Sequence, residues 1–156
     1  MSKPIAFRVL GIPKPQPRPR AFVPKGSTHA SVYDAGTAEG WKGAVALAAR
    51  EFLPETPLAG PLFVDILFIM KRPKAHYRTG KFAHVLRPDA PAFHTGKPDR
   101  DNLEKAILDA LTQLGFWGDD GQVCGGEVRK MYGKHPGADI AIESAQAQAA
   151  FEEAER

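Results

Sequence analysis

Two pairs of aspartates flank one amphipathic stretch of this 156-residue chain, residues 102–114. Asp99 and Asp101 stand one residue apart before the stretch, and Asp119 and Asp120 follow it. Carboxylates that converge without histidine or thiolate are hard oxygen ligands, which suit magnesium or manganese rather than zinc. A magnesium ion held in this way can activate water and stabilise charge on a phosphodiester. If the pairs meet, we expect Asp99, Asp101 and one member of the second pair to form a metal site for phosphodiester hydrolysis.

The stretch between the pairs has the spacing of a helix, and its polar side carries a cation. Lys105 follows Asp101 by four residues, so both lie opposite the apolar stripe, where Lys105 can hold a phosphate oxygen or position the attacking water. Asp101-x-x-Glu104 is also typical of a capping box, and we expect Asp101 to combine capping with metal binding. A helix of 13 residues is roughly 20 Å long. The connection after the helix must therefore run back along the sheet if the two pairs of aspartates are to meet, and the metal site depends on that convergence.

Basic residues are concentrated in two segments outside the acidic pattern. Residues 1–35 contain six lysines and arginines against one acid, and residues 71–100 contain eight against two. Such a distribution indicates a polyanionic partner, although two solvated loops would give the same pattern. We predict phosphate contacts, and hence DNA binding, for Arg18, Arg20, Lys71, Arg72, Lys74 and Lys130.

Composition and cysteine content indicate an ordinary soluble domain. The chain is 43% hydrophobic and 25% charged, with a net charge of +3. Its one cysteine, Cys124, excludes an internal disulfide and is typical of a reducing compartment. The longest apolar run, residues 62–70, is too short to span a bilayer. We therefore expect a cytoplasmic protein that does not enter the membrane.

The elements that must position the aspartates can be read from periodicity and from Pro and Gly. Strands are predicted at 5–12, 61–70, 127–133 and 138–144, and helices at 37–52 and 102–114. A proline-rich basic arm at 13–25 is expected to be extended, a long basic loop to occupy 71–98, and the tail at 145–156 to form a frayed or docked helix. This order predicts a single α+β domain over residues 1–156, with a mixed sheet packed by two main helices.

The acidic stretch as a whole resembles the RusA family of Holliday junction resolvases, which is found in bacteria and their phages. KPDRDNLEKAILDALTQLGFWGDDGQV (residues 97–123) carries the pattern D-x-D-N-L-x-K-A-x-x-D-A-L followed by D-D-x-Q-V, and Lys130 follows in VRKMYG. The strong match covers these 27 residues. The strand from Phe63, the loop before Asp99 and the opening strand agree more weakly, and the proline-arginine arm departs from the best-known members.

The resemblance implies a RusA-like homodimeric nuclease that uses magnesium, or manganese in its place, to cut four-way DNA junctions in recombination and repair. It further implies that Asp99, Asp101 and Asp120 are the catalytic, metal-binding carboxylates, with Asp119 beside them in a less defined role. Lys105 matches the catalytically important lysine of the family.

Other functions remain open at this level. A related metal-dependent nuclease for flaps or other branched DNA would have the same residues. A junction-binding protein without catalysis is disfavoured because every acidic position of the pattern is filled. A D-x-D nucleotide-sugar transferase would leave Asp119 and Asp120 without a role.

Overall fold

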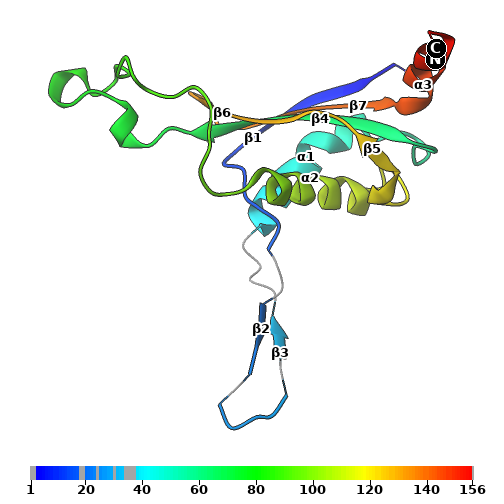
Figure 1. Ribbon diagram of the computed structural model, residues 1–156, viewed down its shortest axis with the longest axis horizontal. Helices are drawn as coiled ribbons and strands as arrows, with labels where there is room; N and C mark the ends of the chain where they lie inside the picture. The colour runs from blue at the N-terminus through cyan, green and yellow to red at the C-terminus, as the bar shows by residue number, and fades with distance from the viewer. Residues whose placement is uncertain (1–2, 18–19, 24, 30, 34–37, 156) are drawn as a thin grey trace.

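The chain forms one mixed sheet with helices and a separate ribbon of two short strands (Figure 1). The computed structural model describes residues 3–17, 20–23, 25–29, 31–33 and 38–155. Its strands are β1 (Ile5–Leu10), β2 (Arg20–Phe22), β3 (Ser31–Tyr33), β4 (Leu62–Lys71), β5 (Val123–Gly125), β6 (Val128–Gly133) and β7 (Gly137–Ser144). Its helices are α1 (Glu39–Ala49), α2 (Arg100–Leu114) and α3 (Ala145–Ala154), with short 3₁₀ turns at Arg50–Phe52, Lys74–His76, Gly80–Phe82 and Asp120–Gln122.

The main sheet combines antiparallel and parallel pairs. β1 pairs with β7 and β7 with β4, both antiparallel, while β5 and β6 both run parallel to β4 along its other edge. A parallel neighbour requires a crossover connection, and here the segment from the end of β4 through α2 supplies it. The predicted small α+β domain with a mixed sheet and two main helices is confirmed.

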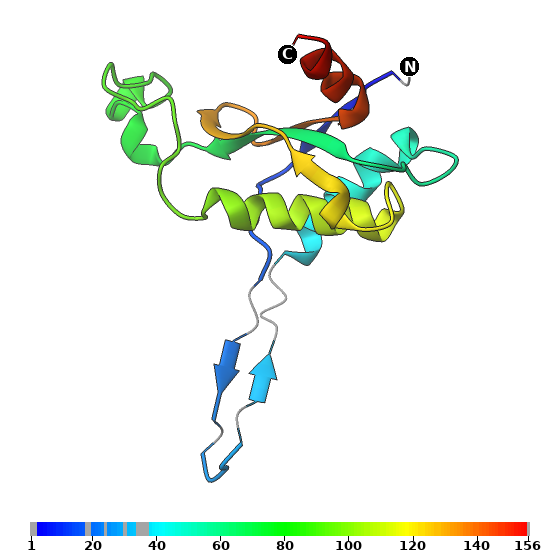
Figure 2. The same cartoon turned by 45° about the vertical axis from the view of Figure 1, so that its right-hand side comes forward.

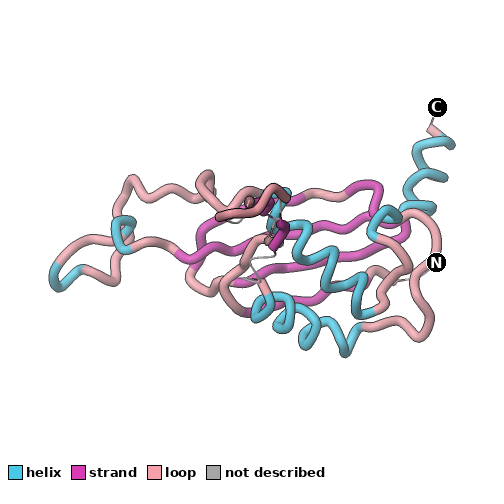
Figure 3. The backbone as a smooth tube through the Cα atoms, turned by 90° about the horizontal axis from the view of Figure 1, so that it is seen from below, coloured by secondary structure: helices cyan, strands magenta, loops and turns pink. Residues whose placement is uncertain are grey.

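The core lies between the sheet and the pair α1 and α2, which cover the same face (Figures 1 and 3). Alternate residues of β4 are buried against the helices because side chains along a strand point to opposite faces. The stripe of α2 fits the helical period of 3.6. The buried residues are Leu62, Val64, Ile66, Phe68 and Met70 from β4, Trp41, Val45 and Ala49 from α1, and Leu103, Ala106, Ile107, Ala110 and Leu111 from α2. Burying one such large aliphatic side chain stabilises the fold by roughly 1.5–3 kcal/mol, which fixes α2 firmly on the sheet.

Some predicted elements differ from the observed ones. Residues 11–17 have neither helix nor strand, and Arg20–Phe22 pairs with Ser31–Tyr33 in a ribbon that projects beyond the helix layer, a strand pairing that was not predicted (Figure 2). Lys71 belongs to β4, and the long loop therefore begins at Arg72. The short strand β5 was not predicted, because three residues are too few to show an alternation of apolar and polar side chains. The tail forms α3, and among the described residues no helix is long and apolar enough to cross a membrane.

Candidate active site

Helix α2 begins at the first aspartate pair. Asp99 occupies the N-cap position with extended backbone angles, and the helix starts at Arg100. The predicted capping role of Asp101 is therefore wrong, because the helix begins before Asp101, which lies in its first turn. Both carboxylates lie at the positive end of the helix dipole, where negative charge is stabilised. At the other end Gly115 adopts a left-handed conformation with φ 97°, which stops the helix.

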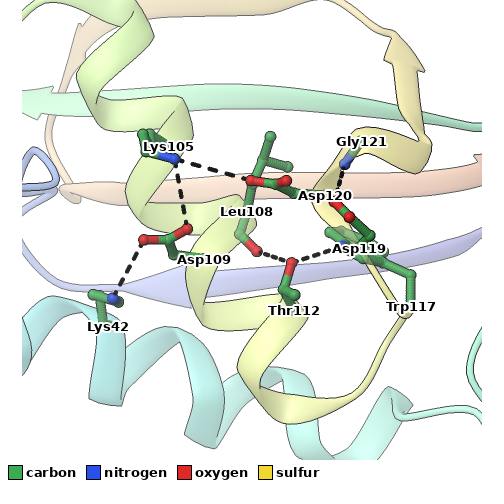
Figure 4. A network of polar contacts seen from close by, with 9 residues as sticks. All are labelled: Lys42, Lys105, Leu108, Asp109, Thr112, Trp117, Asp119, Asp120 and Gly121. Atoms are coloured by element: carbon green, nitrogen blue, oxygen red, sulfur yellow. Dashed lines mark hydrogen bonds and ion pairs between the residues drawn. The ribbon is translucent and has the colours of Figure 1, made fainter.

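The chain reverses directly after α2 and is fixed there by two aromatic side chains. Phe116 and Trp117 are buried, with exposed fractions of 0% and 1%. Trp117 Nε1 donates to Thr112 Oγ1 at 2.7 Å, and that hydroxyl donates to the carbonyl of Leu108 at 2.7 Å (Figure 4). This connection ties the returning chain to the last turns of the helix, so its direction is determined by core packing rather than by the polar turn that follows.

The second aspartate pair lies in a braced turn. Asp119 Oδ1 accepts a hydrogen bond from the backbone N–H of Gly121 at 2.7 Å, and this bond holds the pKa of Asp119 below its usual value. Gln122 Oε1 accepts from the backbone N–H groups of Gly118 and Asp119, at 2.9 and 3.2 Å. Gln122 Nε2 in turn donates to two carbonyls before β4, both at 3.0 Å. The carboxylate of Asp119 therefore caps the turn, in a capping box with Gln122.

Asp120 points the other way, toward the polar side of α2. Lys105 Nζ lies 3.9 Å from Asp120 Oδ2 and 3.8 Å from Asp109 Oδ1 (Figure 4). Asp109 Oδ2 is also 3.8 Å from Lys42 Nζ of α1. Since Lys105 precedes the end of α2 by about 14 Å of helix, the returning chain has come back along α2 as far as Lys105, on the helix face that also carries Asp101.

A lysine of the sheet holds the loop that leads into Asp99. Lys130 Nζ donates to the carbonyls of Gly96 and Pro98, at 2.9 and 2.8 Å. The backbone N–H of His94 donates to the carbonyl of Lys130 at 3.1 Å. Burial lowers the pKa of Lys130, while the negative charge of Asp99 raises it. The ammonium of Lys130, predicted as a phosphate contact, is directed here to two backbone oxygens beside Asp99.

The other predicted DNA contacts have different surroundings. Lys71 and Lys74 are exposed and line a hollow of about 380 Å³ with Arg72 and Lys134. Arg72 donates to the carbonyl of Pro91 at 2.8 Å and lies 5.4 Å from the centre of the Tyr132 ring, so it also braces the loop. Arg20 lies in β2, and Arg18 is outside the described residues.

The carboxylates do not form a closed metal cage in this conformation. Among the residues the structure describes, no three histidine, cysteine, aspartate or glutamate side chains are gathered closely enough to hold a metal ion. Asp99 Oδ2 instead accepts from Lys97 Nζ at 2.9 Å. The donor chemistry nevertheless fits magnesium or manganese, since only carboxylate oxygens are present and an ion with several waters needs few of them.

Sequence reasoning missed the groups that support these aspartates. Gln122, Asp109 and Lys97 each bond to a residue of the acidic pattern or to its backbone. Gln122 stands inside the quoted pattern D-D-x-Q-V, so its spacing from Asp119 was the available signal of a capping box. Lys97 carried no signal beyond the general excess of basic residues before Asp99.

The chain is similar in sequence to a protein family and to several individual proteins. The family model described as Endodeoxyribonuclease RusA matches residues 11–143. The Uncharacterized protein YqaN of Bacillus subtilis is 34% identical over 143 residues, which cover 88% of this chain and 94% of that protein. The Crossover junction endodeoxyribonuclease RusA of Escherichia coli K12 and that of Enterobacteria phage 82 are each 61% identical over 33 residues, 21% of this chain and 28% of those proteins. The chain therefore belongs to the RusA family of endodeoxyribonucleases.

Proposed function

We propose that this protein is a structure-selective endodeoxyribonuclease that resolves four-way DNA junctions by metal-dependent hydrolysis, in recombination and repair in the cytoplasm. One observation carries the proposal. Asp120 lies 3.9 Å from Lys105, on the side of α2 that also carries Asp101, and Asp99 directly precedes this helix. The family match over residues 11–143 supports a nuclease, and the name of the E. coli relative supports a junction as the substrate.

The catalytic roles follow from charge and position. Asp99, Asp101 and Asp120 would hold Mg²⁺, or Mn²⁺ in its place, because carboxylate oxygens are the ligands these ions prefer. When bound, the ion would activate water and stabilise negative charge on the phosphodiester. Lys105 would hold a non-bridging phosphate oxygen or position the attacking water. Asp119 serves the turn rather than the ion, since its Oδ1 already accepts from Gly121.

The DNA contacts are proposed to extend from the site toward both basic segments. Lys71, Arg72 and Lys74 lie at the end of β4 and in the loop that leads to Asp99, and would bind phosphates beside the cut. Arg18 and Arg20 belong to the arm and would contact a more distant part of the junction. Lys130 contributes chiefly by holding the loop, through its bonds to Gly96 and Pro98.

A four-way junction has two symmetric strands to cut, so we propose that the active form is a homodimer. Two copies related by a twofold axis would present two sites to the junction. Sedimentation equilibrium tests this assembly independently of activity. A mass of one chain at the concentrations that cut DNA would exclude it.

The decisive experiment compares substrates and metals with one purified protein. Four-way junction, flap and single-stranded DNA are incubated with Mg²⁺, Mn²⁺ or EDTA, and products are separated on denaturing gels. We expect symmetric junction cuts with either metal and none in EDTA. Asp101→Asn should abolish cutting while junction binding persists, and Asp89→Asn, at an exposed loop aspartate, is the matched control.

The outcomes separate the proposal from its alternatives. Equal cutting of flaps and junctions would replace the resolvase with a general branched-DNA nuclease. Tight junction binding without cutting under any metal would indicate a non-catalytic junction-binding protein. Undiminished cutting in EDTA, or by Asp101→Asn, would contradict the metal site.

A further inference from the structure

A groove of about 490 Å³ opens directly beside Asp99, and apart from Asp99 and Lys71 its lining residues have no role in the proposed function. It is formed by residues 12–15 after β1, the end of β4, the loop before α2 and the first turn of α2. Its volume is within the range of about 300–1,000 Å³ typical of sites that bind small organic groups. Four chain segments that are distant in sequence thus build a hollow next to a proposed metal-binding carboxylate.

The walls of the groove are largely apolar. Ile12, Pro13, Pro15 and Met70 line it, and Ile12 is 48% exposed. His94 also lines it, and burial, followed by the nearby Lys130 charge, lowers the pKa of His94, which favours the neutral imidazole. Apolar side chains with an imidazole ring among them suit the face of an aromatic group.

The groove is also fixed in shape. The backbone N–H of Gln16 donates to the carbonyl of Asn102 in α2 at 2.9 Å, which attaches the segment after β1 to the helix. Prolines at 13 and 15 restrict the backbone of this segment. This attachment and the two prolines limit the freedom of the segment, which lowers the entropy cost of ordering it on binding.

The charged residues of the groove favour a negatively charged ligand. Lys14, Lys71 and Lys97 line it, with Asp99 as its acid. A hollow of equal size, about 490 Å³, lies over the sheet face that α1 and α2 leave uncovered, but its charged lining is mainly acidic: Asp65, Glu127, Asp139 and one basic residue, Arg129. A polyanion is attracted to the first hollow and repelled from the second.

We propose that the groove beside Asp99 binds a nucleobase of the cleaved strand, unstacked from its neighbours, next to the phosphate at the catalytic carboxylates. The apolar walls take the face of the base, and the three lysines bind the phosphates on either side of it. The branch point of a four-way junction is where a base is most easily released from its stack, because its helical stacking is already interrupted. The groove would thereby couple branched structure, and the identity of one base, to the position of the cut. This inference rests on the proposed function.

The test uses junctions that carry 2-aminopurine at single positions around the cut. Its fluorescence rises when it leaves the base stack. Measurements are made in EDTA, so that the strands stay intact, while anisotropy of a dye on a distant arm shows when the junction is saturated. We expect a several-fold rise at one position next to the scissile phosphate. Ile12→Asp should abolish that rise, and Leu47→Asp, at a 68% exposed leucine of α1, should leave it unchanged.

A second measurement does not depend on variants. A photoreactive 5-iodouracil at the same position should crosslink to the peptide containing residues 12–15, to Met70 or to His94, which all line the groove. Suppose that the junction binds and is cut in Mg²⁺, but no 2-aminopurine position responds or the crosslink lies outside the groove. The groove then holds at most the DNA backbone, and this inference is overturned while the proposed function stands. If no DNA binds, both fail.

Discussion

Lys105 Nζ and Asp120 Oδ2 lie 3.9 Å apart, although 15 residues and a complete chain reversal separate them. The lysine projects from the polar side of α2, and the aspartate comes from the braced turn before β5 (Figure 4). Their contact joins the two halves of the acidic pattern, and the two side chains are 59% and 41% exposed. An ion pair this accessible contributes little to folding stability, so we expect its loss to affect activity more than folding.

Replacing Lys105 should therefore damage catalysis far more than stability or DNA affinity. We expect Lys105→Met to lower the single-turnover cutting rate by roughly 10²–10³-fold, the loss typical of one transition-state donor. Lys105→Arg should recover part of the rate, and Lys81→Met, at an exposed loop lysine, is the control. An unchanged rate with weakened junction binding would make Lys105 a simple phosphate contact.

Substitution of the neighbouring aspartates Asp119 and Asp120 should have clearly different effects on DNA cutting. Asp120→Asn removes a proposed metal ligand and should abolish cutting. Asp119→Asn keeps an oxygen that can accept from Gly121, so it should retain most activity, since asparagine is an equally good cap. Parallel cutting assays over a range of Mg²⁺ concentrations measure both. Equal losses in the two variants would show that Asp119 also binds the ion.

The lowered pKa of Asp119 gives this turn a defined dependence on pH. A carboxyl whose pKa is lower in the folded protein stabilises the fold fully above its unfolded pKa, and that stabilisation is lost as pH falls through the folded pKa. The asparagine at 119 cannot titrate. The thermal stability of wild type relative to Asp119→Asn should therefore decline below about pH 4. Calorimetric scans between pH 7 and pH 3 check the sign, and a constant difference would contradict it.

Lys130 should act on the reaction through the loop before Asp99. Lys130→Met removes the bonds to Gly96 and Pro98, so we expect a lower cutting rate and a higher Mg²⁺ requirement with junction affinity nearly unchanged. Lys130→Arg can restore a donor and should recover part of the rate. If Lys130 instead contacts a phosphate directly, Lys130→Met should weaken junction binding. The slope of the logarithm of the binding constant against the logarithm of salt concentration should then fall by about one.

Glycine 126 offers a stability prediction independent of the site. Its φ is +134°, and an added Cβ would lie 2.0 Å from the carbonyl oxygen of Val64. Gly126→Ala should destabilise the protein by about 1–3 kcal/mol, because backbone strain and a clash coincide. Gly43→Ala, inside α1 with open space around its Cα, should instead stabilise by about 0.5–1 kcal/mol. Chemical denaturation of both variants measures the contrast.

Local periodicity was sufficient to predict the elements that carry the site. The apolar stripe of α2 and the alternation of β4 are strong because both elements bury one complete face. The ribbon of β2 and β3 and the three-residue β5 were missed, since strands this short show no pattern of their own. β5 forms because its three residues pair with the edge of β4, and that pairing depends on the tertiary structure rather than on the local sequence.

The residues of the candidate site could be proposed from the sequence, but their bonds could not. The family pattern predicts Asp99, Asp101, Asp120 and Lys105 as site residues, and the structure brings the last two together. Whether a lysine such as Lys130 meets phosphate or backbone depends on how a loop of nearly thirty residues folds back on β6. No local pattern encodes that return.

The return of this loop has a consequence for solubility. β6 pairs with β4 on one side, and its other side would expose unpaired backbone groups, a surface on which strands of separate molecules add to one another. Backbone bonds from His94 to Lys130 and from Tyr132 to Ala92, with a bridge between Phe93 and Met131, occupy that side. The segment that delivers Asp99 to α2 therefore also covers the β6 edge of the sheet against edge-to-edge aggregation. A variant that releases the loop should first be checked for self-association before its lost activity is assigned to chemistry.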